Sequence, residues 1–140
     1  MPDAASLPAC VRAHDRVPRA KVVSALRSSD FTVLMRDPGK RFAQAGMPTK
    51  VTESLGCGTP VIANITSDLG GFLEDGRDAI VVEEYSADAC ARALRKAACL
   101  PAAERVVMRE AAYATARARL DYRAYADALD AFLLGGGERG

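Results

Sequence analysis

The sequence is poor in residues that bind metals. It contains one histidine, His14, and its four cysteines form no C-x-x-C pair. Structural zinc sites need closely spaced Cys and His ligands, so we expect no zinc cluster. We interpret the cysteines as reduced thiols of a cytoplasmic protein.

Excess charge and long apolar runs are also absent. The 19 Lys and Arg residues nearly balance the 18 Asp and Glu residues, and the net charge of +1 gives no support for nucleic-acid binding. No stretch approaches the ~20 apolar residues of a membrane span, and the N-terminus does not resemble a signal peptide. We therefore expect one soluble domain with no membrane span.

Several catalytic and nucleotide-binding motifs are missing. The sequence has no G-x-G-x-x-G, no G-x-x-x-x-G-K-[ST] and no Ser-His-Asp set. The sequence does alternate between short apolar runs typical of strands and segments whose apolar residues recur at helical spacing. The short runs predict strands at 9–14, 31–35, 61–63 and 79–82. The helical spacing predicts helices at 18–28, 48–56, 69–74, 102–120 and 121–134. It predicts a further helix that Ser86 caps and Pro101 ends.

This order predicts an α/β fold with a parallel sheet of about four strands, helices on both of its faces and a run of helices at the C-terminus. The arrangement is Rossmann-like. Ligands bind at the carboxyl ends of the strands in such sheets. The loop 36–45 and the loop 64–68 each follow a predicted strand, so we expect both at that edge.

The stretch 46–63 is the centre of this pattern. It holds a Gly-Met-Pro-Thr turn, a short helix, glycines that end the helix, and a buried strand. Glu53 lies one turn inside the helix, where a carboxylate can accept hydrogen bonds from two ribose hydroxyls while the helix N-terminus binds a diphosphate. The alternative is that Glu53 only caps the helix or complements its dipole.

Cations gather around the start of this helix. Arg36, Lys40 and Arg41 lie in the preceding loop, and Lys50 lies in the first helical turn, an unfavourable place unless an anion is bound there. They could neutralise phosphate groups, or they could be ordinary surface charges of a solvated loop. The polar residues of the second loop could likewise line a sugar site or merely cap the loop. These residues are Asn64, Thr66, Ser67 and Asp68.

The stretch 46–63 resembles the donor-binding signature of the group 1 retaining glycosyltransferases, which have the GT-B fold. Similar patterns precede it at 29–36 and follow it at 67–82, and the likeness extends over about residues 11–134. In that family the C-terminal of two Rossmann-like domains binds a nucleoside diphosphate sugar without a metal ion. The resemblance implies donor-site residues, no catalytic residue, no metal ligand and no cofactor. The donor-site residues are Arg36, Arg41, Gly46, Met47, Thr49, Lys50 and Glu53.

One position departs from the family pattern. The second Glu of the family's Glu-x7-Glu motif contacts ribose and matches Glu53. The first, which contacts the donor sugar, falls on Ala45. The family's acceptor-binding domain with its catalytic histidine has no counterpart here. We therefore expect a partial donor domain at 1–134, a disordered tail at 135–140, and no transfer activity without a separate N-terminal half.

Two further expectations follow from the resemblance. The alternative function is a non-catalytic nucleotide-binding or partner module, either a truncated enzyme or one half of a split one. The last predicted helix carries Tyr122, Tyr125, Leu129, Phe132 and Leu133. This face is too apolar for a free surface helix, so we expect an exposed apolar patch or pairing with a partner.

Overall fold

The computed structural model describes residues 7–135. Most helices begin and end within two residues of the sequence expectation. The elements in chain order are α1 (Arg19–Ser28), β1 (Thr32–Leu34), the 3₁₀ helix η2 (Arg41–Ala43), α2 (Thr49–Gly56), β2 (Val61–Asn64), the 3₁₀ helix η3 (Ser67–Gly71), β3 (Ala79–Val82), α3 (Ala87–Cys99), α4 (Ala102–Arg119), the 3₁₀ helix η4 (Tyr122–Tyr125) and α5 (Ala126–Gly135).

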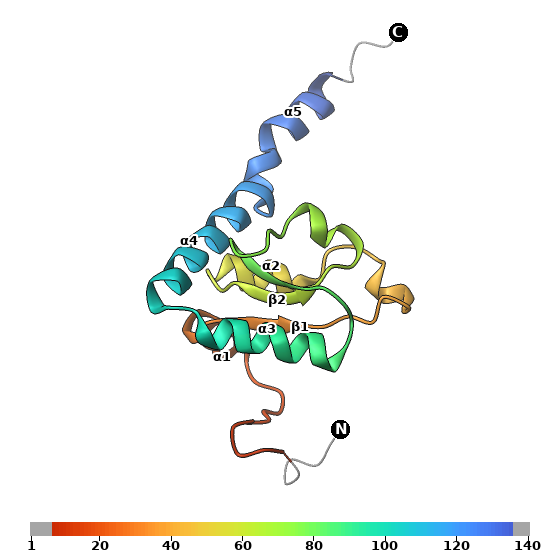
Figure 1. Cartoon of the computed structure of the whole chain (residues 1–140). Coiled ribbons are helices and arrows are strands. Elements are labelled where there is room, and N and C mark those ends of the chain that lie inside the picture. The colour runs from red at the N-terminus through yellow and green to blue at the C-terminus, as the bar shows by residue number, and fades with distance from the viewer. Residues whose placement is uncertain (1–6, 136–140) are drawn as a thin grey trace.

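The sheet is parallel, as the alternation of elements predicts. Its three strands lie in the order β1-β2-β3, with Thr32 opposite Val61 and Val61 opposite Ala79. All four residues of β2 are buried, because this central strand is covered on both faces and on both edges. The α/β class is therefore confirmed (Figure 1).

The predicted strand at 9–14 is wrong, so the sheet has three strands in the described part of the chain and not four. Residues 9–14 are exposed and take no ladder position. The Val11 N–H bonds the Pro8 carbonyl oxygen at 2.8 Å, which makes a turn there. Val11 is the only large apolar side chain of the stretch and it is 48% exposed, so the stretch gains too little burial to join the sheet.

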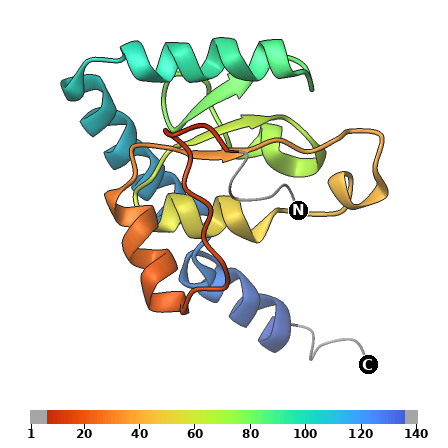
Figure 2. The same cartoon turned by 90° about the horizontal axis from the view of Figure 1, so that it is seen from below.

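Helices cover both faces of the sheet, and each face has its own apolar cluster. The first cluster joins β2 and β3 to α2 and α4 through residues such as Val51, Leu55 and Ala112. The second joins the opposite face to α3 and to Met108 of α4. Figures 1 and 2 show α3 on one side of the strands and α2 on the other, with α4 crossing the end of the sheet. The prediction of helices on both faces is confirmed.

The core-facing sides of the two long helices differ in part from the expectation. The sequence suggests Cys90, Leu94 and Ala97 for α3, with Ala93 beside them. Ala93 and Ala97 are buried together with Ala89, whereas Leu94 is 45% exposed. In α4, Met108, Ala112, Thr115 and Ala116 are buried. Val106 and Val107, expected on the core face, are mostly exposed. Small alanines at i, i+4 spacing let each helix approach the sheet closely.

Glycine and serine fix the end of α2 against β2. Gly58 has φ +69° and its N–H bonds the Leu55 carbonyl oxygen at 2.9 Å. The Ser54 hydroxyl donates to the Thr59 carbonyl oxygen at 2.8 Å. A left-handed residue just after a helix is a common helix stop. The glycine stop predicted at Gly58 is therefore confirmed.

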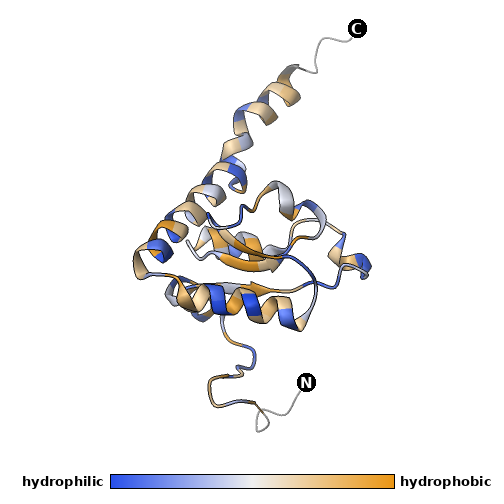
Figure 3. Ribbon diagram, in the orientation of Figure 1, coloured by the Kyte–Doolittle hydropathy of each residue, from blue (hydrophilic) through white to orange (hydrophobic). Residues whose placement is uncertain are grey.

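The last helix projects from the body of the domain (Figure 1). The predicted helix at 121–134 is divided into η4 and α5, and α5 continues to Gly135, while residues 136–140 lie outside the described range. Figure 3 shows orange, hydrophobic segments on α5 that no other element covers. Phe132 is 78% exposed and Leu133 64% exposed. The expectation of an exposed apolar patch is confirmed.

Candidate functional site

The carboxyl ends of the strands form one edge of the molecule, because all three strands are parallel. The loop 35–48 leaves β1 at this edge and leads into α2. Since α2 runs back toward the start of β2, its N-terminus faces the same edge. Parallel sheets bind ligands at this edge, and six of the seven predicted donor-site residues lie in the loop or in the first turn of α2. The seventh is Glu53, one turn into α2.

Arg36 is buried where β1 ends, although charged residues rarely are. Only 9% of the residue is exposed. Its Nη2 donates to the carbonyl oxygen of Phe42, and its Cζ lies 5.8 Å from the centre of the Phe42 ring. The second terminal nitrogen, Nη1, is buried and has no partner among residues 7–135. A buried guanidinium donor without an acceptor is costly unless something else accepts from it.

Asn64, the last residue of β2, holds the start of the loop after β1 to the end of β2. Its Oδ1 accepts from the Arg36 N–H at 2.8 Å. Its Nδ2 donates to the Arg36 carbonyl oxygen, also at 2.8 Å. The side-chain amide thus takes the place of a further backbone pair. Of the two predicted roles for Asn64, capping of the loop is the one with contacts in the structure.

The start of α2 is open to an anion. The helix begins without a side-chain cap, and its first turn holds no acidic residue. Thr49 and Lys50 are exposed in this turn, and Glu53 is exposed one turn further on. Among the described residues, no ion pair joins Arg36, Arg41 or Lys50 to a carboxylate. Positive charge from the side chains and from the helix dipole therefore collects here.

The loop places the remaining predicted residues apart from one another. Met47 is half-buried and packs against the cluster that contains Val51 and Leu55. Gly46 has φ +69°, and a Cβ added there meets no atom within 4 Å, so the glycine serves the turn. Arg41 is exposed on η2. Met47 thus joins the start of α2 to the core, whereas Arg41 is exposed to solvent.

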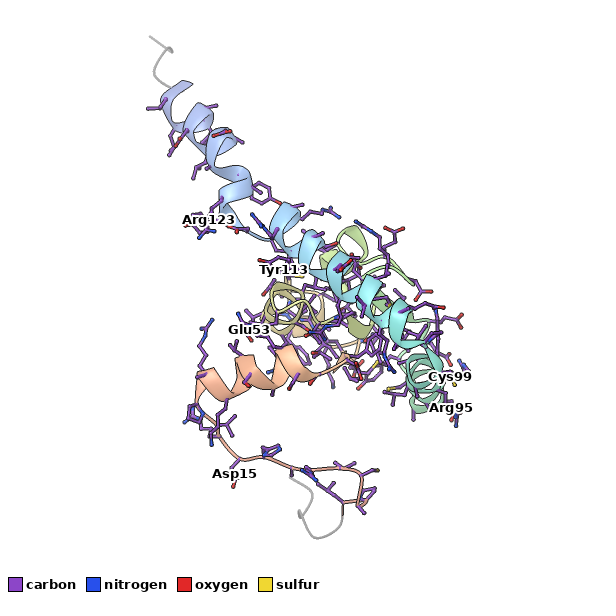
Figure 4. All side chains as sticks on the ribbon, turned by 90° about the vertical axis from the view of Figure 1, so that its left-hand side faces the viewer. Asp15, Glu53, Arg95, Cys99, Tyr113 and Arg123 are labelled. Carbon is purple, nitrogen blue, oxygen red and sulfur yellow. The ribbon has the colours of Figure 1, made fainter. Side chains whose placement is uncertain are left out.

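Glu53 lies on the side of α2 near α1 (Figure 4). It makes no ion pair among residues 7–135, so its carboxylate is free to accept from a ligand. The capping role, the alternative for Glu53, has no contact in the structure. His14 is exposed on the segment before α1, remote in sequence from this edge.

The sequence reasoning missed Phe42 at this edge, and it did not predict the burial of Thr66. Phe42 provides the carbonyl and the ring that hold Arg36, although it is 63% exposed. The hydroxyl of Thr66, which follows β2, is buried and is the second buried side-chain atom without a partner in the described range. Thr66 stood among the loop candidates, but nothing in its sequence context signals burial.

Other features of the surface do not coincide with this edge. An apolar hollow of about 360 Å³ lies at the opposite edge, between the end of α3 and the start of α4, and Leu100 and Val107 line it. Residues 7–135 contain no group of His, Cys, Asp and Glu that could hold a metal ion. Within the same residues, every helix is too short or too polar to traverse a lipid bilayer.

Comparison with known proteins identifies the family. Residues 4–131 match the family model described as "Glycosyl transferase-like". No curated protein matches the chain. The match includes α2, the loop before it and all three strands. The residues that form the open carboxyl edge are therefore part of the shared domain, and the chain belongs to the glycosyl transferase-like family.

Proposed function

We propose that this chain binds the sugar donor of a glycosyl transfer reaction, a nucleoside diphosphate sugar, at the carboxyl edge of its sheet. The observation that carries the proposal is the uncapped N-terminus of α2, which opens on this edge without an acidic residue in its first turn. Backbone N–H groups and the helix dipole favour a diphosphate at such a position. Family membership supports glycosyl transfer as the reaction.

In this proposal, different residues of the edge contact different parts of the donor. Glu53 accepts hydrogen bonds from the ribose hydroxyls, since its carboxylate is exposed and unpaired in the described range. Lys50, with the backbone of Gly46 and Met47, faces the diphosphate. Ala45 has only a methyl group where the resembled family has a carboxylate for the sugar. The chain therefore recognises the nucleoside diphosphate more strongly than the sugar.

The proposed mechanism is that of a retaining transferase of the GT-B type, to which the signature at 46–63 is similar. Negative charge develops on the diphosphate as the bond between sugar and phosphate breaks. The cations and helix N–H groups of this edge are already in place to stabilise that charge, and such preorganisation lowers the barrier. This chain supplies the donor side of the reaction, so we expect no transfer by the chain alone.

Calorimetric titration of the chain with uridine, adenosine and guanosine diphosphates tests donor binding. We expect one of them to bind, and Glu53→Ala to weaken it about tenfold or more, because each hydrogen bond to a charged group contributes about 1.5–3 kcal/mol. Glu110→Ala, on α4, is the matched control and keeps full affinity. Absence of binding by all three, or equal affinity in both variants, would refute donor binding.

The exposed apolar face of α5 favours a second candidate, a non-catalytic partner module. Tyr122, Leu129 and Phe132 are each more than half exposed, which is unusual for side chains with no binding role. The two functions differ in a simple readout. A partner module is indifferent to nucleoside diphosphates and to Glu53→Ala, whereas a donor domain responds to both.

A further inference from the structure

Arg36 has one terminal nitrogen engaged and one unengaged, and this asymmetry needs an explanation. Nη2 donates to the Phe42 carbonyl oxygen. Nη1 is buried without a partner among residues 7–135, although the residue is only 9% exposed. Buried arginine nitrogens nearly always have acceptors. The side chain therefore holds a donor ready for an acceptor that the described residues do not supply.

The pattern of β1 shows where this donor lies. Alternate strand residues point to the same face, and Thr32 and Leu34 face α2. The Thr32 hydroxyl lies 2.8 Å from the Ser54 hydroxyl oxygen of α2 and donates to it, because the Ser54 proton goes to the Thr59 carbonyl oxygen. Leu34 packs against the cluster formed with Val51 and Leu55. Phe31 and Met35, on the other face, pack against the α3 cluster. Arg36 follows the last residue of β1 by two positions, so it lies at the carboxyl end of the sheet, where the N-terminus of α2 also opens.

The unengaged nitrogen of Arg36 and the open N-terminus of α2, both at the carboxyl end of the sheet, are suited to the same kind of ligand group. Arginine offers several N–H donors in a planar fork and keeps its charge when buried. The helix start adds backbone N–H groups and the positive end of the dipole. Tetrahedral oxyanions such as phosphate accept from both sources. Lys50, exposed in the same turn, adds a further positive charge.

The other end of the guanidinium connects this position to the loop. The loop 37–44 has its own internal bonds, from Gly39 N–H to Asp37 Oδ1 at 2.9 Å and from Gln44 Nε2 to the Pro38 carbonyl oxygen at 2.8 Å. Arg36 reaches it through the carbonyl and ring of Phe42. An acceptor that fixes Nη1 therefore also fixes the contact that Nη2 makes with this loop.

We infer that Arg36 binds a phosphate group of the ligand through Nη1 and, through Nη2, holds the loop 37–44 in place when that phosphate is bound. This inference rests on the proposed function, because it assigns the phosphate contact of the same donor site. It goes further in naming a residue whose two nitrogens couple occupancy of the site to the order of a neighbouring loop.

Inorganic pyrophosphate is the probe, because it carries the two phosphates without base, ribose or sugar. Calorimetry measures its affinity for the full chain, for Arg36→Lys and for Arg95→Gln. Arg95 lies on α3 beside Cys99, far from Glu53 (Figure 4), and is the control. We expect Arg36→Lys to bind pyrophosphate about tenfold more weakly, because lysine keeps the charge but loses the fork that makes two directed bonds. Arg95→Gln keeps the affinity of the parent chain.

Limited proteolysis with trypsin provides a second readout, and its main comparison, with and without pyrophosphate, uses the parent chain. Lys40 and Arg41 are exposed in the loop, so trypsin can cleave after them. We expect saturating pyrophosphate to slow this cleavage severalfold in the parent chain, and to have no such effect in Arg36→Lys. Unchanged cleavage of the parent chain at saturation overturns the inference, even if the variant fails to fold.

The outcomes separate this inference from the proposed function. If a nucleoside diphosphate binds in a Glu53-dependent manner while Arg36→Lys keeps full pyrophosphate affinity, the role of Arg36 is wrong and donor binding stands. If pyrophosphate binds and protects the loop through Arg36 but no nucleoside diphosphate binds more tightly than pyrophosphate, donor recognition fails and the phosphate contact stands. If trypsin cleaves Arg36→Lys faster than the parent chain but the variant binds pyrophosphate with the parent affinity, Arg36 has only a structural role. That result overturns the inference.

Discussion

At the scale of single residues, the side chain of Asp78 joins α4 to the turn before β3. It is fully buried just before β3, and it accepts from Thr115 Oγ1 at 2.6 Å and from the Glu74 N–H at 2.9 Å. Asp78→Ala leaves both donors without this acceptor. We expect the free energy of unfolding to fall by about 2–3 kcal/mol, measured by urea denaturation.

A double-mutant cycle shows whether the Asp78–Thr115 contact causes this loss. Thr115→Val removes the donor with little change of shape, and the double variant removes both groups. We expect a coupling energy of about 0.5 kcal/mol or more between the two sites, as is usual for residues in contact. Additive losses would show that the contact with Thr115 does not cause the loss, which would leave the contacts of Asp78 with the Glu74 N–H and with Arg77.

Asp75 gives the chain a defined response to acid. Burial acts to raise its pKa, but hydrogen bonds from the Val81 N–H, Lys96 and Gly76, together with the Lys96 charge, outweigh burial and lower the pKa below its ordinary value of 3.8. The Lys96 Nζ lies 3.0 Å from Asp75 Oδ2. Because the folded state holds the charged form, the stabilisation is present above the unfolded pKa and is lost as the pH falls through the folded one.

The Asp75→Asn variant tests this response. We expect it to unfold at a lower temperature than the parent chain at neutral pH, and the difference to shrink as the pH falls below 3.8, the ordinary pKa of the group. Thermal melts followed by circular dichroism at a series of pH values measure it. A difference that is constant across the series would mean that the charge of Asp75 contributes nothing.

Burial of charged residues marks the limit of sequence reasoning at this scale. The sequence identifies Arg36 as a candidate, but not that it is buried or that one nitrogen is engaged. Its partner Phe42 lies six residues away in a loop, and the partner of Asp78 lies 37 residues away on α4. Such pairs depend on tertiary packing, which local patterns do not encode. Charged residues are expected at the surface by default.

At the scale of elements, the end of α2 offers two glycines only two residues apart with opposite expectations. Gly58 has φ +69°, and a Cβ there would lie 3.5 Å from the Arg109 carbonyl oxygen. We expect Gly58→Ala to lower the free energy of unfolding by about 1–2 kcal/mol, because left-handed backbone is unfavourable for alanine. Chemical denaturation monitored by circular dichroism measures the loss.

Gly56→Ala is the matched control for this element. Gly56 is the last residue of α2, and a Cβ there meets nothing within 4 Å. Alanine at a helical position without strain reduces the freedom of the unfolded chain, so we expect no loss or a gain of about 0.4–1 kcal/mol. Equal losses at both positions would contradict the assignment of Gly58 as the left-handed helix stop.

Elements with strong local signals are predicted well from the sequence. Ala79–Val82 has the expected bounds, and the Ser86 side chain accepts from the Ala89 N–H as a cap of α3. The faces of α3 and α4 are predicted only in part, because the alanines that are buried lie next to larger apolar residues that are exposed. Ala93 is buried while Leu94 is exposed, since the close approach of α3 to the sheet favours the smaller side chain.

At the scale of the whole molecule, α5 is an appendage of the domain. Its large apolar residues are exposed, and from η4 the only side-chain bond back to α4 is that of the Tyr125 hydroxyl to the Arg119 carbonyl oxygen, at 2.8 Å, among the described residues. We expect a chain that ends at Asp121 to lose less than about 1.5 kcal/mol of unfolding free energy, the net contribution of one hydrogen bond. Urea denaturation of the two chains measures it.

The same truncation deletes the exposed apolar side chains of η4 and α5. We expect the full chain to bind the dye 1-anilinonaphthalene-8-sulfonate more strongly than the truncated one, since the dye reports exposed apolar surface. Phe132→Ser, at a side chain that is 78% exposed, serves as control. It weakens dye binding and leaves the unfolding free energy unchanged. A large loss of stability on truncation would mean that α5 packs on the domain in solution.

The sequence predicts the type of architecture, a parallel α/β sheet, but not the number of strands. Alternation of strand and helix patterns predicts a parallel sheet, and the register of Val61 with both Thr32 and Ala79 confirms it. The count of strands is wrong because 9–14 has little apolar surface to bury. The candidate site is predicted in its position at the strand ends. Its contacts depend on the fold of the loop 36–48, for which the sequence has no periodic signal.

The side chain of Asn64 makes the geometry of the carboxyl edge vulnerable to chemical ageing. Its amide alone accepts from the Arg36 N–H and donates to the Arg36 carbonyl oxygen. Hydrolysis of that amide to a carboxylate would keep the acceptor but replace the donor with an oxygen that faces another oxygen. Asparagine is among the thermolabile residues. A single slow covalent change at this position would therefore separate the start of the loop after β1 from the end of β2, while the rest of the strand pairing remained.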